Sequence, residues 1–149
     1  MISMICGIDP GRFKIGFAAA EGEDLIFSAI IPKTEEKIIA EALINGRTEL
    51  LSPWLKEGSA DVAVGAGFSK IYVGDGTSSD EIKKLLDADM RIETVKEYGT
   101  TLEGRKLYWH LHRPQGLWKL IPTSLRMPPR DIDDLAAWAI IKIGLKSEK

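Results

Sequence analysis

The sequence has little cysteine and histidine and no long apolar run. Cys6 is its single cysteine, so no disulfide can form within the chain, which suits a reducing compartment. The only histidines, His110 and His112, are two residues apart and would point to different faces of a helix, which argues against a histidine metal site. No apolar stretch approaches the roughly 20 residues that a membrane-spanning helix needs, and MISMICGI lacks the basic start of a signal peptide. We therefore expect a cytoplasmic protein.

The length and composition predict one ordinary folded domain. The chain has 149 residues, of which 44% are hydrophobic and 28% are charged. A domain of this size buries about two-thirds of its unfolded surface, so it needs no disulfide or metal to fold. We expect a single domain over residues 1–149.

Charge is nearly balanced overall but is distributed unevenly. The net charge is −2, yet residues 104–130 contain no acidic residue and six basic ones: Arg105, Lys106, Arg113, Lys119, Arg126 and Arg130. The rest of the chain therefore carries about −8. Such a basic segment favours binding to a polyanion such as nucleic acid, and we expect Arg12 and Lys14, which precede the second strand, to add phosphate contacts.

Aromatic residues are interleaved with these charges. Tyr108, Trp109 and Trp118 could stack on unpaired bases while the cations neutralise phosphates. The alternative is that Tyr108 and one tryptophan pack on the sheet and the cations are only solvated. The sequence leaves both interpretations open.

The apolar pattern predicts an α/β fold with a five-stranded mixed sheet. Strands at residues 4–8, 15–20 and 25–31, joined by short turns, form an antiparallel meander. A helix capped by Thr34 follows and ends near Gly46, whereas residues 47–67 show no consistent pattern. Two further strands, 70–73 and 91–95, alternate with a helix capped by Ser79, a helix at 100–112 and a last helix starting at Asp131. Residues 115–130 are expected to form an exposed connection.

Acidic residues follow three of the predicted strands and begin the last helix. Asp9, Asp75 and Glu97 each come just after a strand, while Asp131, Asp133 and Asp134 crowd the first turn of the helix. If the strand ends meet at one edge, these carboxylates converge, and their repulsion would require a cation among them. Oxygen ligands without His or Cys suit Mg²⁺ or Mn²⁺, and two such ions can support phosphodiester hydrolysis.

Each acidic residue also has a purely structural explanation. Asp9 begins an Asp-Pro-Gly turn, and Asp75 lies in a Gly-Asp-Gly turn. Asp131 is a suitable helix N-cap, and Asp133 and Asp134 interact favourably with the helix dipole. What favours a site is that the candidates fall at the same end of the predicted sheet.

Asp9, Gly11, Ile15, Gly16 and Ala18 form a D-x-G-x-x-x-I-G-x-A pattern near the start of the chain. With this pattern the chain resembles the RNase H-like nucleases of the RuvC Holliday junction resolvase superfamily, most closely the YqgF/RuvX group of resolvase-like and pre-16S rRNA processing nucleases. KEYGTT, residues 96–101, is similar to D-E-R-L-T-T and aligns Glu97. IDDLAA is similar to a hydrophobic-D-x-x-A-A pattern and aligns Asp133, whereas the RuvC form D-x-x-D-A-L-A would select Asp131 and Asp134.

This resemblance implies an RNase H-like fold and a site for two Mg²⁺ or Mn²⁺ ions. Its ligands would be Asp9, Glu97 and an aspartate of the last helix, with Asp75 as a further ligand because RuvC has an acidic residue after that strand. The expected activity is hydrolysis of phosphodiester bonds in structured nucleic acid, either branched DNA or an RNA precursor. A junction resolvase would be expected to act as a homodimer.

Two other functions fit parts of the sequence. Tyr98 and Gly99 replace the Arg and Leu of the group's second motif, so a nucleic-acid-binding protein without catalysis is the main alternative. Actin- and hexokinase-like ATPases share the opening strand, Asp and Gly turn, but they need two such domains. The nuclease is the leading prediction.

Overall fold

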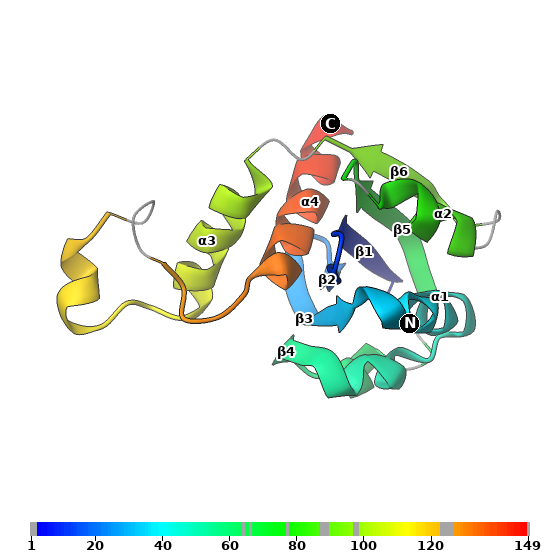
Figure 1. The fold of residues 1–149 in the computed structure, drawn as a ribbon, viewed down its shortest axis with the longest axis horizontal. Helices are drawn as coiled ribbons and strands as arrows, with labels where there is room; N and C mark the ends of the chain where they lie inside the picture. The colour runs from blue at the N-terminus through cyan, green and yellow to red at the C-terminus, as the bar shows by residue number, and fades with distance from the viewer. Residues whose placement is uncertain are drawn as a thin grey trace.

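A computed structural model describes residues 3–63, 65, 67–76, 78–86, 90–96, 99–122 and 127–148. Its strands form one six-stranded mixed sheet with the order β4-β3-β2-β1-β5-β6 (Figure 1). The strands are β1 Ser3–Pro10, β2 Lys14–Glu21, β3 Asp24–Pro32, β4 Leu55–Gly58, β5 Gly67–Gly74 and β6 Ile92–Val95. β1, β2 and β3 form an antiparallel meander, and β5 and β6 run parallel to β1. The predicted α/β class, meander and two parallel strands are therefore confirmed.

The prediction of five strands was wrong because β4 joins the sheet. β4 pairs antiparallel with β3 at the sheet edge, between short 3₁₀ helices at Thr48–Trp54 and Ala60–Ala63. Its four residues, LKEG, are too few and too polar to show a strand pattern, and Pro53 lies just before them. Pairing with β3 gives this segment its extended shape, which local sequence does not.

Four α-helices accompany the described strands: α1 Glu36–Asn45, α2 Ser79–Leu85, α3 Thr100–Leu111 and α4 Asp133–Ser147. The predicted N-caps of α1, α2 and α4 are each wrong by one residue, and Ile132 rather than Asp131 is the N-cap of α4. Thr34 lies in a 3₁₀ turn before α1, the N-cap of α2 is Ser78, and neither helix has a side-chain cap hydrogen bond. Gly46 ends α1 with a φ of 67°, as predicted. None of the helices in these ranges has the length and apolarity that crossing a bilayer requires.

The sheet is covered on both faces. Met4, Cys6 and Ile8 of β1 belong to a core cluster with Ile39 of α1 and Ile82 of α2. The other face carries α4, with α3 packed beside it, and Figure 1 shows these two helices on the side of the sheet opposite α1 and α2. The described parts of residues 112–132 reach away from the sheet beyond α3 and return to the start of α4, as the predicted exposed connection requires.

Glycines let α4 lie directly on the two central strands. A Cβ atom at Gly16 of β2 would be 1.9 Å from the carbonyl oxygen of Asp133, and one at Gly7 of β1 would be 2.3 Å from that of Ala137. No side chain fits at either position. The first turns of α4 therefore contact the backbone of β1 and β2.

Replacing Gly16 with alanine is expected to destabilise the fold by about 1 to 3 kcal/mol, because the new methyl group must displace the backbone of α4. Urea unfolding would measure the change. Gly67→Ala is the matched control, since a Cβ at Gly67 meets nothing within 4 Å, and no loss of stability is expected there. Equal stability of the two variants would contradict this close packing of α4.

Candidate carboxylate site

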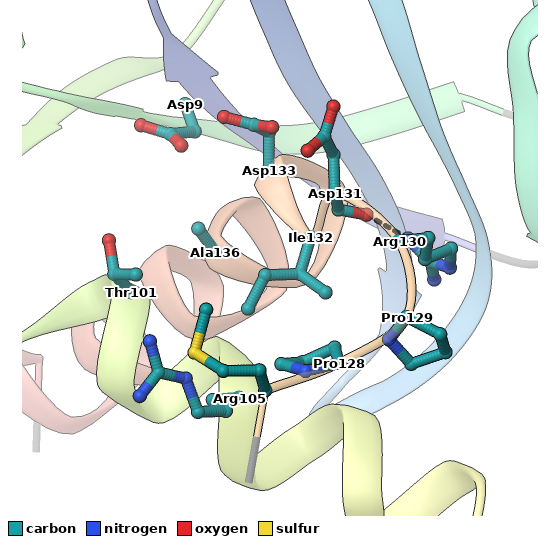
Figure 2. Close-up of a pocket in the computed structure, with 11 residues that line it drawn as sticks. Asp9, Thr101, Arg105, Pro128, Pro129, Arg130, Asp131, Ile132, Asp133 and Ala136 are labelled. Carbon is teal, nitrogen blue, oxygen red and sulfur yellow. Dashed lines mark hydrogen bonds between the residues drawn. The ribbon is translucent and has the colours of Figure 1, made fainter. Parts of the chain in front are cut away.

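A pocket of about 420 Å³ opens where β1 ends and α4 begins. Its walls come from the end of β1, from α3 and from the chain that leads into α4 (Figure 2). The lining residues are Asp9, Thr101, Arg105, Met127, Pro128, Pro129, Arg130, Asp131, Ile132, Asp133 and Ala136. Three carboxylates and two guanidinium groups thus line one cavity.

Strand register and helix docking bring Asp9 and Asp133 together. Asp9 of β1 is paired with Gly16 of β2, so both residues face the side of the sheet that α4 covers. The backbone of Asp133 rests on Gly16, next to this pair. Figure 2 shows the two side chains beside each other at one end of the pocket. The sequence-predicted residues Asp9 and Asp133 therefore share one site.

Lys14, the first residue of β2, lies against the acidic residues that begin α4. Its Nζ atom is 2.6 Å from Oδ2 of Asp131 and 3.3 Å from Oδ2 of Asp133. The hydrogen bond to Asp131 is the main reason that the pKa of Lys14 is raised, and the same bond lowers the pKa of Asp131. Lys14 is consequently a charged ammonium group at neutral pH. It was predicted to contact phosphate, but here it pairs with carboxylates.

Asp134 does not line the pocket, although it is adjacent to Asp133 in the sequence. Its side chain is fully buried and accepts a hydrogen bond of 2.6 Å from Oγ of Ser28. Arg130 donates to both of its oxygens, at 2.8 and 3.2 Å. Consecutive helical residues point about 100° apart, so only Asp133 can face Asp9. The structure places Asp134 in an internal ion pair.

The ion pair extends into a network that sequence reasoning missed. Arg130 also donates to Oε2 of Glu57 at 2.7 Å, and Nε2 of His112 lies 2.8 Å from the same oxygen. The Arg130 guanidinium lies 5.5 Å from the ring centre of Tyr108. The spacing of Arg130 and Asp134, four residues apart, is the one signal in the sequence that could have indicated the pair. Through this network, β4 and α3 are tied to the chain entering α4.

Acid should weaken this network through Glu57. Burial tends to raise the pKa of Glu57, but its bonds to His112 and Arg130 outweigh burial, so the pKa lies below the ordinary value of 4.5. A carboxyl group of this kind stabilises the fold above its unfolded pKa and loses that contribution as the pH falls through its folded pKa. Glu57→Gln should therefore lower the free energy of unfolding at pH 7, and its difference from wild type should shrink below about pH 4.5.

Urea unfolding at a series of pH values would test this expectation. The control is Glu21→Gln, which removes an exposed carboxylate at the end of β2 and should change stability by about 0.5 kcal/mol or less. A difference between Glu57→Gln and wild type that stays constant down to pH 3 would contradict the role given to Glu57.

Asp75, a further predicted acidic ligand, is not among the residues that line the pocket. Asp75 is exposed just after β5, and its backbone N–H donates to the carbonyl of Val95 at 3.0 Å. The pairing of Ile8 with Val73 puts Asp75 at the same end of the sheet as Asp9, but Asp75 is not among the lining residues. Glu97 lies outside the described residues, as does Arg126.

The predicted nucleic-acid contacts are divided between the pocket and the surface. Arg105 lines the pocket, whereas Arg12, Arg113 and Lys119 are exposed. Lys106 is exposed as well and pairs with Glu103 at 3.2 Å. Arg130 lines the pocket but is held by Asp134 and Glu57, which limits it as a phosphate contact.

The aromatic residues of α3 pack rather than present stacking surfaces. Tyr108 is buried in a cluster with Leu135 and Trp138 of α4, and Trp109 is partly buried against the same cluster. This arrangement favours the alternative in which they contribute to the core. The side chain of Trp118 lies outside what the structure describes.

The donor chemistry of the pocket fits a hard cation in part. Asp9 and Asp133 offer only oxygen ligands, as Mg²⁺ and Mn²⁺ prefer. Within the described residues, however, no group of three or more His, Cys, Asp or Glu side chains is arranged to hold a metal ion. Three of the predicted ligands, Asp9, Asp131 and Asp133, therefore line the pocket without being arranged as a complete metal site. No protein-family model matches the chain, and no curated protein is significantly similar to it.

Proposed function

We propose that this protein is a divalent-metal-dependent nuclease that hydrolyses phosphodiester bonds of structured nucleic acid. The observation that carries the proposal is the placement of Asp9 and Asp133 together at a 420 Å³ pocket whose other wall carries Arg105. Anionic residues that can hold metal ions thus face a cation that can hold a phosphate. This combination suits a phosphodiester substrate better than a neutral one.

The resemblance to RNase H-like nucleases of the RuvC superfamily supports the same function. That family implies a meander followed by two parallel strands, an arrangement this sheet has in β1, β2, β3, β5 and β6. Gly16, part of the opening motif, is the residue on which the backbone of Asp133 rests. The motif therefore has a physical role in placing an aspartate of α4 next to Asp9.

The residues would divide the work as follows. Asp9 and Asp133 hold the cation, with Glu97 as the third ligand implied by the resemblance, and Asp131 borders the site. Bound Mg²⁺ or Mn²⁺ would supply an activated water and stabilise the leaving oxygen. Arg105 pairs with the phosphate from the α3 side, and the exposed Arg113 and Lys119 attract the nucleic-acid backbone.

A cleavage assay tests the proposal directly. Purified protein should cut a structured RNA or a four-way DNA junction with Mg²⁺ or Mn²⁺ present, and EDTA should stop the reaction. Comparing the two substrates would also decide between RNA and DNA. If the folded protein cleaves neither substrate with either metal, the proposal is overturned.

A nucleic-acid-binding protein without catalysis is the second candidate function. It is favoured because Lys14 already pairs with Asp131 and Asp133, and because no group of three acidic, His or Cys side chains among the described residues is arranged to hold a metal. Under this function, binding of the same RNA or junction would weaken as salt increases, but no metal would produce cleavage. The double variant Arg113→Ala, Lys119→Ala should weaken binding. It should also reduce the slope of log affinity against log salt concentration by about two.

A further inference from the structure

The ammonium group of Lys14 lies within the carboxylate cluster rather than pointing into solvent. It bridges Asp131 and Asp133 at 2.6 and 3.3 Å. Lys14 and Gly16 are two residues apart on β2, so the strand's alternation puts Lys14 on the same face as Asp9, the face that α4 covers. Its side chain is 40% exposed, whereas that of Asp133 is 30% exposed. A cation supplied by the chain thus contacts the carboxylate expected to bind a metal.

Elementary electrostatics explains why the chain keeps a cation there. Asp9, Asp131 and Asp133 line the same pocket, and like charges at close range repel one another. One positive charge against two of these carboxylates reduces that repulsion. The same charge repels an incoming divalent cation and occupies an oxygen of Asp133 that such a cation would need.

We propose that Lys14 is the resident counter-ion of Asp133 and sets the affinity of the site for divalent cations by competing with them. This inference rests on the metal site of the proposed function. A divalent ion that binds Asp9 and Asp133 must displace the ammonium group from Asp133. Lys14 can then remain on the more exposed Asp131, whose side chain is 69% exposed, or pair with a phosphate of the substrate. The site therefore binds its metal less tightly than its carboxylates alone would allow.

The test is a titration of the full-length protein with Mn²⁺, followed by calorimetry or by the electron paramagnetic resonance signal of free Mn²⁺. Removing the charge with Lys14→Met should tighten Mn²⁺ binding by about 5- to 30-fold. In a partly hydrated site, repulsion from a unit positive charge a few ångströms away weakens the binding of a divalent ion by about this factor. Lys14→Arg retains the charge and should bind Mn²⁺ much as wild type does.

Two matched controls locate the effect. Lys37→Met removes an exposed charge from α1, on the other side of the sheet, and should leave Mn²⁺ affinity unchanged. Adding Asp9→Asn to Lys14→Met should abolish the increase in Mn²⁺ affinity, because the bound ion would lose one of its ligands. Lys14→Gln provides a second neutral variant, and circular dichroism would verify that each variant is folded.

The outcomes separate this inference from the proposed function. If wild type binds Mn²⁺ and folded Lys14→Met or Lys14→Gln binds it equally or more weakly, the counter-ion role is wrong while the metal site stands. If neither wild type nor the neutral variants bind millimolar Mn²⁺, the metal site is wrong, and this inference fails with it. Tighter binding in both neutral variants, but not in Lys14→Arg or Lys37→Met, is the expected result.

Discussion

Replacing Asp9 with asparagine is expected to lower metal-dependent cleavage by about 100-fold or more. Mutating a residue that only orients a metal ligand already lowers metal affinity or activity by about 10- to 100-fold, and Asp9 is expected to bind the metal directly. The change keeps the size and shape of the side chain at the end of β1 but removes the charge that a cation needs. Single-turnover cleavage of the structured RNA or four-way junction would measure the loss. The melting temperature should change by only a few degrees.

The matched control for this variant is Asp61→Asn, which neutralises an exposed aspartate in the 3₁₀ helix Ala60–Ala63, away from the pocket. Its cleavage rate should equal that of wild type. If Asp9→Asn cleaves as fast as Asp61→Asn, then Asp9 is a turn residue and not a ligand.

Replacing Asp134 with alanine is expected to reduce the free energy of unfolding by about 3 to 5 kcal/mol, as breaking one side of a buried ion pair does. The change would leave Arg130 without its bidentate partner and the hydroxyl of Ser28 without its acceptor. For a chain of this length, such a loss lowers the melting temperature by about 10 °C or more. Thermal and urea unfolding would both report it.

Asp131→Ala is the control because it removes the same residue type three positions earlier, where the side chain is largely exposed. Its surface ion pair with Lys14 should contribute little to stability, because solvent screens it. Combining Asp134→Leu, Arg130→Met and Ser28→Ala should restore much of the stability, because no buried polar group is then left unpaired.

The activity of Asp134→Asn distinguishes the two registers that the last motif allows. Since Asp134 is turned toward Ser28 and away from the pocket, folded Asp134→Asn should keep most of its cleavage activity. A variant that stays as stable as wild type yet loses cleavage as completely as Asp9→Asn would identify Asp134, and not Asp133, as the ligand.

Most of the fold was predictable because its strands and helices follow from local sequence patterns. Short apolar runs between turns identified β1, β2 and β3, and the 3.6-residue period identified α4. The edge strand β4 was not predicted because its four residues are too few to show a strand pattern. They are held extended by their pairing with β3. The helix starts were displaced because Thr34 and Ser79 have capping chemistry that this tertiary arrangement does not use.

The candidate site was predictable only as a set of residue types at strand and helix ends. Asp9 and Asp133 could be nominated from their positions, and register then placed both at the same pocket. The sequence could not separate Asp133 from Asp134, because both are acidic residues in the same helical turn. That choice depends on which side of α4 faces β1 and which faces Ser28 of β3.

The sequence by itself determined the α/β class, the meander, the position of Asp9 and the uneven charge, since each depends on residues close together in the chain. The tertiary structure alone decided that Lys14 pairs with Asp131 and Asp133, and that Arg130 is held by Glu57 and Asp134. These pairs join residues that are up to 119 positions apart. Only the docking of α4 on Gly7 and Gly16 brings such charges within bonding distance, and no local pattern encodes that approach.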